Sequence, residues 1–307
     1  MSEPVIQVQG LRFAYGARPV LHGVDLAVRA GEIYGLVGAD GAGKSTLLRI
    51  AVGELAPGGG SVRVLGRTPA DPEVRAQIAY MPQGFALYPD LTVRENMQFF
   101  ADLHGLSRDD APRRIRALLA RTGLEGFEER RAGQLSGGMM QKLALACALI
   151  AAPRVMFLDE PTTGVDPLSR RSFWSLLDGV RAEGVAVLYA TANFDEAERC
   201  DRIGFLEGGR LRRQGTPLEM AAAPGATLVS VTGPDARRRR RALRGLPGVS
   251  LVFPVGARLH VWLEAGYGPE TFRAALAGIA PELRAEVIEP TLHDAALREL
   301  ALAGGRS

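Results

Sequence analysis

The chain has 307 residues, of which 47% are hydrophobic and 23% charged, and its formal net charge of +3 gives no argument for nucleic-acid binding. Its length allows one large and one small domain. Cys147 and Cys200 are the only cysteines and lie far apart, which argues against a disulfide scaffold or a zinc site and suits a reducing cytosol. Residues 1–10 lack the basic and apolar regions of a signal peptide. The apolar run 143–153 has roughly half the length that a membrane-spanning helix needs. If the protein acts at a membrane, we expect it to dock onto another chain.

Hydrophobic periodicity predicts strands in the first part of the chain. Residues 5–13 and 20–28 alternate apolar and polar side chains, as half-buried strands do. Residues 32–38 form a short apolar run that ends in glycine, which is typical of a buried parallel strand. A glycine-rich loop and a helix follow directly, and another strand is expected at 61–66.

The pattern becomes helical between residues 92 and 150. Thr92 and Glu95 have the Thr-x-x-Glu spacing of a capping box, which marks the start of a helix. Three helices are expected, at 96–103, 111–121 and 138–151.

Two more buried strands are predicted at 155–159 and 185–191, with a helix near 168–182 between them. Strands that alternate with helices of this length predict a parallel sheet flanked by helices. Residues 203–215 fit a strand, a Gly-Gly turn and a strand. We therefore expect an α/β domain.

A new pattern begins after Pro224 and Gly225, which predict a linker. Strand, helix, two strands, helix and strand follow in order, which predicts a small α+β domain of the ferredoxin-like type. Residues 291–303 predict a final amphipathic helix. We place the two domains at 1–223 and 226–307 and expect the second to regulate or dimerise the protein.

The strongest chemical signal is the sequence Gly-Ala-Asp-Gly-Ala-Gly-Lys-Ser-Thr at 38–46, between a predicted strand and a predicted helix. This is the P-loop spacing, in which glycines let backbone N–H groups surround a triphosphate at a helix N-terminus. Lys44 would add a point charge between the β- and γ-phosphates, and Ser45 a hydroxyl for Mg²⁺. The residues expected to bind ATP here are Gly38, Asp40, Gly41, Ala42, Gly43, Lys44, Ser45 and Thr46.

The predicted strand 155–159 ends in two adjacent carboxylates, Asp159 and Glu160. Two acids at the end of a buried strand are costly unless they have a function there, and parallel sheets bind ligands at this edge. We expect Asp159 to join the Mg²⁺ shell and Glu160 to accept a proton from the attacking water.

Residues 135–139, Leu-Ser-Gly-Gly-Met, open the predicted helix 138–151. These residues resemble the signature loop Leu-Ser-Gly-Gly-Gln of the ABC ATPase family, and the P-loop and the Asp-Glu pair are similar to that family too. The resemblance covers roughly residues 4–222. It implies an α/β P-loop NTPase fold with a RecA-like core, an antiparallel β subdomain and a helical subdomain at about 84–151. In that family two cassettes close head to tail, so that each ATP lies between one P-loop and the partner's signature.

The resemblance adds further residues to the expected site. Tyr15 matches the aromatic residue that stacks on adenine. Gln83, in Tyr-Met-Pro-Gln, matches the Q-loop glutamine, which implies a part in catalysis and in Mg²⁺ coordination. Asp166, in Gly-Val-Asp-Pro, matches the D-loop. The signature residues expected at the nucleotide of the partner cassette are Ser136, Gly137 and Gly138.

Two positions depart from the family pattern. Met139 replaces the last residue of the signature, which we expect to be tolerated. Residues 191–197 align with Thr-His-x-x-Asp-Glu-Ala, and Ala192 replaces the switch histidine that contacts the γ-phosphate. Loss of one preorganised polar group of this kind slows a reaction by about 100- to 1000-fold. Asn193 is either a helix N-cap or a substitute for the histidine. We therefore expect slow hydrolysis at this chain's own site.

Residues 80–96 and 135–150 are similar to ATPases of ABC-2-type exporters, the drug-resistance and antibiotic-export group. Residues 291–300 are similar to the tail of that group except at His293 and Ala296. Within the group the chain resembles the atypical first cassette of tandem-cassette ATPases. This implies a separate ABC-2-type permease, a second cassette that is a different chain rather than a copy, peripheral attachment at the cytoplasmic face of the membrane, and a drug-like or hydrophobic cargo.

The alternative is an ATP-binding regulator, or a soluble ABC ATPase that acts on ribosomes or DNA. Ribosome-acting members usually hold two cassettes in one chain, and DNA-acting members insert long coiled coils; this sequence has neither feature. The five arginines at 237–241 would point all around a helix, which fits a solvated face, a nucleic-acid groove or contact with anionic lipid. We expect no nucleic-acid partner.

Overall fold

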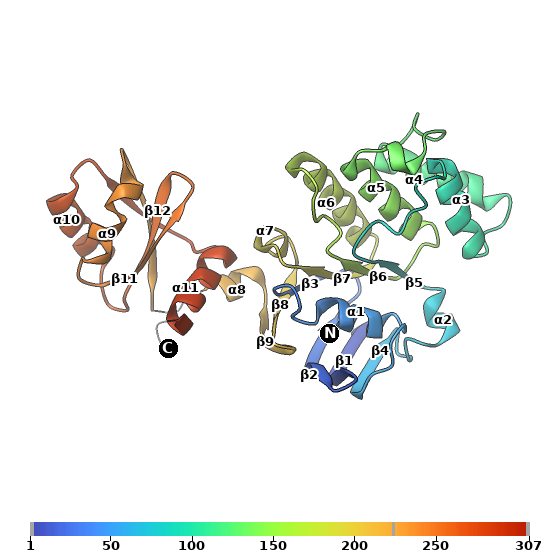
Figure 1. Ribbon diagram of the computed structural model, residues 1–307, viewed down its shortest axis with the longest axis horizontal. Coiled ribbons are helices and arrows are strands. Elements are labelled where there is room, and N and C mark those ends of the chain that lie inside the picture. The colour runs from blue at the N-terminus through green and yellow to red at the C-terminus, as the bar shows by residue number, and fades with distance from the viewer. Residues whose placement is uncertain (1–2, 223–224, 305–307) are drawn as a thin grey trace. The chain divides into compact units, whose positions relative to one another are not determined.

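The computed structural model describes residues 3–222 and 225–304, and the chain divides into two compact units, 1–215 and 216–307 (Figure 1). The division precedes the linker expected from the sequence, of which Pro224 lies outside the described residues. Helix α8 (Pro217–Ala221) belongs to the second unit, where it packs on α11 (Leu292–Gly304). Its start is fixed by a capping box between Thr216 and Glu219.

A six-stranded sheet in the order β5-β6-β7-β3-β8-β9 forms the centre of the first unit. All strands but the edge strand β9 run parallel. Strands β3, β6 and β7 are buried along their whole length, which explains why they are apolar runs rather than alternating sequences. The strands are β3 (Ile33–Val37), β5 (Ile78–Met81), β6 (Val155–Asp159), β7 (Ala186–Thr191), β8 (Arg202–Glu207) and β9 (Arg210–Gly215).

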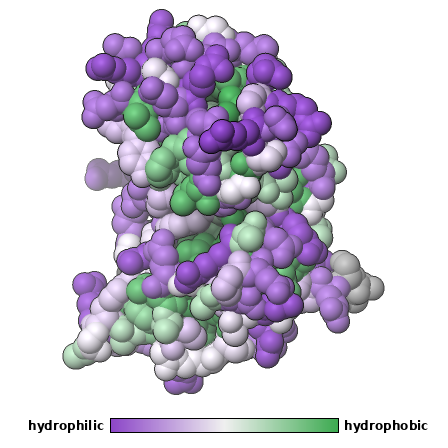
Figure 2. All heavy atoms as spheres, turned by 90° about the vertical axis from the view of Figure 1, so that its right-hand side faces the viewer, coloured by the Kyte–Doolittle hydropathy of each residue, from purple (hydrophilic) through white to green (hydrophobic). Residues whose placement is uncertain are grey.

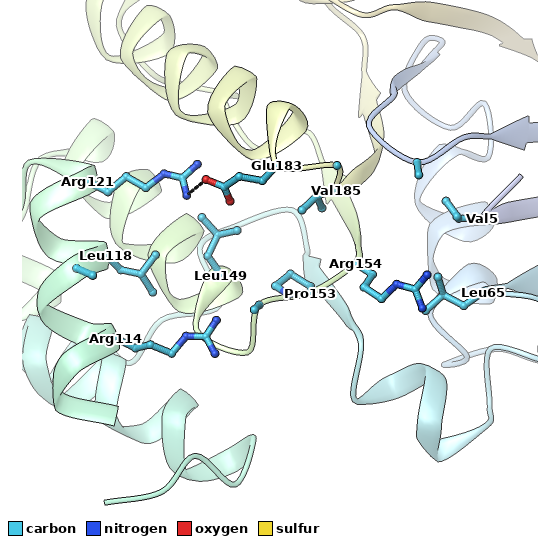
Figure 3. Close-up of a pocket in the computed structure, with 14 residues that line it drawn as sticks. Val5, Leu65, Arg114, Leu118, Arg121, Leu149, Pro153, Arg154, Glu183 and Val185 are labelled. Atoms are coloured by element: carbon cyan, nitrogen blue, oxygen red, sulfur yellow. Dashed lines mark ion pairs between the residues drawn. The ribbon is translucent and has the colours of Figure 1, made fainter. Parts of the chain in front are cut away.

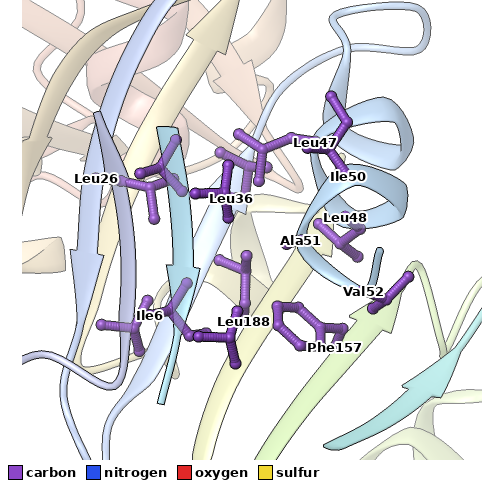
Figure 4. Packing of buried hydrophobic residues seen from close by; sticks show 14 of the residues in the cluster. Ile6, Leu26, Leu36, Leu47, Leu48, Ile50, Ala51, Val52, Phe157 and Leu188 are labelled. Atoms are coloured by element: carbon purple, nitrogen blue, oxygen red, sulfur yellow. The ribbon is translucent and has the colours of Figure 1, made fainter. Parts of the chain in front are cut away.

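An antiparallel sheet in the order β2-β1-β4 and helix α1 (Lys44–Ala51) pack on one side of the central sheet (Figure 1). Its strands are β1 (Ile6–Tyr15), β2 (Arg18–Val28) and β4 (Gly59–Val64), and the short helix α2 (Pro72–Arg75) follows. Figure 4 shows the shared core, in which Ile6 of β1 and Leu47 of α1 lie in one cluster with Leu188 of β7. This core holds α1, and the loop before it, between the two sheets.

Helices α3 (Val93–Leu103), α4 (Asp110–Thr122) and α5 (Gly137–Leu149) form the predicted helical subdomain (Figure 1). The capping box at the start of α3 is confirmed, because the Thr92 hydroxyl accepts from the Glu95 N–H at 3.1 Å and the Glu95 carboxylate from the Thr92 N–H at 2.8 Å. Helix α5 is largely buried, which accounts for its apolar sequence. Every helix within residues 3–222 and 225–304 is too short or too polar to span a bilayer.

The second unit has a four-stranded antiparallel sheet in the order β11-β12-β10-β13. Its elements follow the predicted order: β10 (Thr227–Thr232), α9 (Arg240–Arg244), β11 (Val249–Val255), β12 (Arg258–Leu263), α10 (Pro269–Ile279) and β13 (Arg284–Ile288). The first helix expected in this domain is short, because Asp235 has a φ of +53° and residues 236–239 form a 3₁₀ turn before α9. The arginines 237–241 are all exposed, as each of the three alternatives for this run requires.

Candidate functional site

The glycine-rich loop between β3 and α1 is shaped by backbone conformation and by close contacts. Gly41 and Gly43 have φ values of +78° and +107°, which favour glycine. A Cβ on Gly38 would lie 2.4 Å from the Leu206 carbonyl oxygen, so a side chain has no room there. A Cβ on Gly41 would meet no heavy atom within 4 Å, so this part of the loop borders open space. The loop leads into the N-terminus of α1, whose first N–H groups lack partners within the helix and suit an anion.

Lys44, the first residue of α1, is 4% exposed and reaches back across the loop. Its Nζ donates to the carbonyl oxygens of Gly38 at 2.8 Å and Ala39 at 3.2 Å, and lies 2.9 Å from Glu160 Oε1. The structure therefore brings the predicted phosphate-binding lysine and the predicted general base into direct contact.

Asp159, the last residue of β6, is 2% exposed, and its Oδ1 has no hydrogen-bond partner among the described residues. Burial raises the pKa of this carboxyl, and a hydrogen bond from the Ser45 hydroxyl offsets only part of the shift. A buried carboxylate with an unused oxygen is costly unless a cation completes it. Asp159 and Ser45 supply the hard oxygen ligands that Mg²⁺ prefers, so the pair fits the ion expected from the sequence.

Glu160 follows with a φ of +48°, a left-handed conformation that is rare outside glycine. Its N–H donates to the Ala190 carbonyl at 2.9 Å, and the Thr163 hydroxyl donates to its Oε2 at 3.2 Å. The surrounding contacts thus hold a strained backbone, which turns the carboxylate toward Lys44.

The end of β7 lies beside the loop, because the Gly38 N–H donates to the Thr191 carbonyl at 3.2 Å. Ala192 follows and is exposed. The Asn193 side chain accepts from the Asp195 N–H at 2.9 Å and caps α7 (Phe194–Ala197). Of the two alternatives for Asn193, the structure confirms the helix cap. Position 192 therefore offers only a methyl group at the end of β7.

A buried hydrogen-bond network behind this edge was not predicted from the sequence. Glu196, 4% exposed, accepts from the hydroxyls of Thr191 at 2.7 Å and Tyr189 at 3.0 Å and from that of Thr162. Arg170 Nε lies 3.4 Å from Glu196 Oε1. The network joins the loop after β6 to the end of β7. Its sequence signal is the motif at 191–197, which contains Thr191 and Glu196 but does not reveal that they contact each other.

The signature residues form a second group around the start of α5. Ser136 caps the helix by accepting from the Met139 N–H at 3.3 Å. A Cβ on Gly138 would lie 2.2 Å from Ser169 Oγ in α6 (Pro167–Ala182), whereas one on Gly137 would meet only ordinary contacts. Asp166 caps α6 by accepting from two N–H groups at 3.0 Å. Gly138 of the signature therefore also allows α5 to pack closely against α6.

Two predicted residues lie at the margins of the site. Tyr15 ends β1, is 44% exposed, and packs edge-on against Phe13 with a centroid distance of 4.9 Å. Its hydroxyl accepts from Arg49 of α1 at 3.4 Å. Gln83 lies in the exposed loop after β5, and within the described part of the chain it makes no hydrogen bond to Asp159 or Ser45.

Comparisons with known proteins agree with this geometry. The family described as "ABC transporter" matches residues 21–163. The chain is 39% identical to the probable multidrug ABC transporter ATP-binding protein YbhF of Escherichia coli K12, over 99% of this chain and 53% of the relative, so it spans about half of that protein. It is 38% identical to the Nod factor export ATP-binding protein I of Paraburkholderia xenovorans, over 76% of this chain and 79% of the relative. A solved ATP-binding subunit of an ABC transporter superposes with a TM-score of 0.64 and 32% identity, over 79% of this chain and 95% of that one.

Proposed function

The chain belongs to the family of ABC transporter ATP-binding subunits, and on that premise we propose that it binds and slowly hydrolyses ATP to drive an exporter whose permease is a separate chain. The observation that carries this proposal is the cluster of Lys44, Glu160 and Asp159 at the glycine-rich loop. One cation, one general base and one carboxylate with an unpartnered oxygen meet at the N-terminus of α1, as magnesium-dependent phosphoryl transfer to water requires.

The residues of the cluster would divide the work of hydrolysis. The glycine loop and Lys44 would hold the phosphates, with Lys44 exchanging its contact with Glu160 for a phosphate oxygen. Ser45 and Asp159 would hold Mg²⁺, which supplies charge neutralisation on the phosphates. Glu160, released from Lys44, would accept the proton of the attacking water. Tyr15 would stack on adenine from the end of β1.

Hydrolysis at this site would be slow because Ala192 provides no donor at the end of β7. Thr191 places this position next to the start of the loop, and Asn193 is committed to the cap of α7. A missing preorganised donor costs about 100- to 1000-fold in rate. The signature group with Ser136 and Gly138 keeps its family pattern. Pairing with a different cassette would therefore give one complete site, formed by that cassette's P-loop and this chain's signature.

An apolar surface on the helical subdomain supports the separate permease. Tyr88 and Phe99 are 47% and 39% exposed and contact each other edge-on at 4.7 Å, and Leu103 is 67% exposed. Figure 2 views the molecule from the side of α3 and shows hydrophobic patches that interrupt the hydrophilic surface. Exposed aromatic groups of this kind mark contact surfaces. We place the permease, of the ABC-2 type, against this surface, with the chain at the cytoplasmic face of the membrane.

The cargo is proposed from the relatives alone. One is named for multidrug transport and another for export of Nod factor. A drug-like or hydrophobic small molecule suits both names. Copurification of the tagged chain with a membrane protein would support the transporter assignment, and copurification with ribosomes instead would contradict it.

The decisive experiment compares ATP turnover of the purified chain with that of Ala192→His. We expect the substitution to raise turnover by about 100-fold or more, because it restores the missing donor. Ala120→His, the same substitution at an exposed position of α4 away from the glycine loop, is the matched control and should leave turnover unchanged. A wild-type rate of tens per second that Ala192→His does not change would refute the slow-site proposal.

A further inference from the structure

A cavity of about 500 Å³ lies in the first unit at the sheet edge opposite the nucleotide site. Residues 153–154 and 184–185 of its lining precede β6 and β7, whereas Asp159 and the glycine loop follow parallel strands. One wall is α4, whose Arg114, Ala117, Leu118 and Arg121 share a helix face by their spacing (Figure 3).

The lining has an excess of positive charge. Arg121 is paired with Glu183 at 2.7 Å, and Figure 3 shows this pair on one side of the cavity. Within the described residues, the Arg154 guanidinium donates only to the neutral amide oxygen of Gln77, at 3.3 Å. The Arg114 side chain is half-buried, and its guanidinium has no ion pair or hydrogen bond in the same part of the chain. Two guanidinium groups without an acidic partner therefore border the cavity.

The remaining walls are apolar. Leu118 and Leu149 come from α4 and α5, whereas Val5 directly precedes β1 and Leu65 directly follows β4 (Figure 3). Figure 3 shows the Arg114 guanidinium directed past Leu149 toward Pro153. A ligand that suits this lining has a charged end and an apolar body.

Backbone strain also marks this cavity. Leu65 and Ala152 have φ values of +51° and +50°, and both line the cavity. Non-glycine residues in this conformation are rare and concentrate at functional sites. Among the described residues there are five: these two, Glu160 at the nucleotide site, and Ala86 and Asp235 elsewhere. The volume falls within the range of about 300–1,000 Å³ that is usual for small-molecule sites.

We propose that this cavity binds a small anionic amphiphile, a single apolar chain with a phosphate or carboxylate head. Arg114 holds the head, with Arg154 adding charge, and Leu118 and Leu149 contact the chain. Bound there, the molecule touches α4 and α5 on one side and the loops before β6 and β7 on the other. It therefore braces the helical subdomain against the central sheet.

The test is calorimetric titration of the full chain with decyl phosphate and with decanoate, each below its micellar concentration. We expect one binding site per chain. The anion that binds with the higher affinity identifies the preferred head group. Decyl maltoside, which has the same chain on a neutral head, and inorganic phosphate, which has no chain, should each bind at least tenfold more weakly. Decyl maltoside binding as tightly as both anions would overturn the proposal.

Two variants assign the binding to the cavity. Arg114→Gln should weaken the tighter anion at least tenfold, because a charge-assisted contact is lost. Arg116→Gln removes the same charge from an exposed position of α4 outside the cavity and should change affinity less than twofold. Thermal unfolding checks that both variants fold. If Arg114→Gln does not fold, Arg154→Gln takes its place in the titration. Equal losses in the cavity variant and the control, or no loss in either, would overturn the proposal.

Discussion

Replacement of Gly138 by alanine should loosen the start of the signature helix α5. The new Cβ would lie 2.2 Å from Ser169 Oγ and 2.4 Å from Ser169 Cβ, both well inside van der Waals contact. Ser169 is in the first turn of α6, where rotation about χ1 cannot move its Cβ, so the two helices must separate. Overpacking of this kind costs about 1–3 kcal/mol of unfolding free energy. Gly137→Ala, whose Cβ would come no closer than 3.9 Å to Val165, is the matched control.

Urea unfolding measures this cost, with Trp174 of α6 as the fluorescent probe in a Trp262→Phe background. Gly137→Ala should change stability by less than about 1 kcal/mol, because glycine gives way to a better helix former without a clash. Ser169→Gly removes both clashing atoms. The double variant Gly138→Ala/Ser169→Gly should therefore lose about 1–3 kcal/mol less unfolding free energy than the two single variants lose together. Additive effects, or equal losses in the two alanine variants, would refute the packing argument.

Two further predictions concern buried carboxylates. Because burial holds the pKa of Asp159 above its ordinary value of 3.8, this group destabilises the fold as pH rises through that value. Asp159→Asn should thus raise the melting temperature at pH 7, and this gain should vanish below about pH 4. The substitution should also abolish the effect of Mg²⁺ on nucleotide affinity. A lower melting temperature at pH 7 would contradict this prediction. In the second unit, burial alone would raise the pKa of Asp294, but hydrogen bonds from His260 and Thr291 outweigh burial and lower that pKa. The ionised Asp294 therefore stabilises the fold above pH 3.8, and this stabilisation is lost as the pH falls further. Asp294→Asn should cost about 1–3 kcal/mol at pH 7 in urea unfolding and progressively less as pH falls below 3.8. A loss that does not shrink with falling pH would exclude the hydrogen bonds to the ionised carboxylate as its cause.

The local features of the nucleotide site could be predicted because they are written in short stretches of sequence. The glycine spacing at 38–46, the buried strand ending at Asp159, and the Thr92–Glu95 cap each combine side-chain chemistry with a fixed local geometry. The apolar runs of β3, β6 and β7 predicted burial on both faces of a parallel sheet.

Contacts between distant segments could not be predicted. The close approach of Gly138 to Ser169 depends on how α5 and α6 pack, and the network around Glu196 depends on the loop after β6. The domain boundary had an overlooked signal, since Thr216 and Glu219 have the spacing of a capping box and start a helix of the second unit. The shortened helix near Asp235 follows from one left-handed residue that the arginine-rich pattern does not reveal.

The central claim is that Lys44 and the glycine loop bind the phosphates of ATP with Mg²⁺. Its most direct test is the affinity of the purified chain for Mg²⁺-ATP, measured for the wild type, Lys44→Ala and Lys142→Ala. Lys142 is the chain's only other lysine, so its loss is the matched change of charge. The account predicts that Lys44→Ala weakens binding by about 10- to 100-fold and that Lys142→Ala does not. Equal affinity in all three proteins, or no affinity in the wild type, would contradict it.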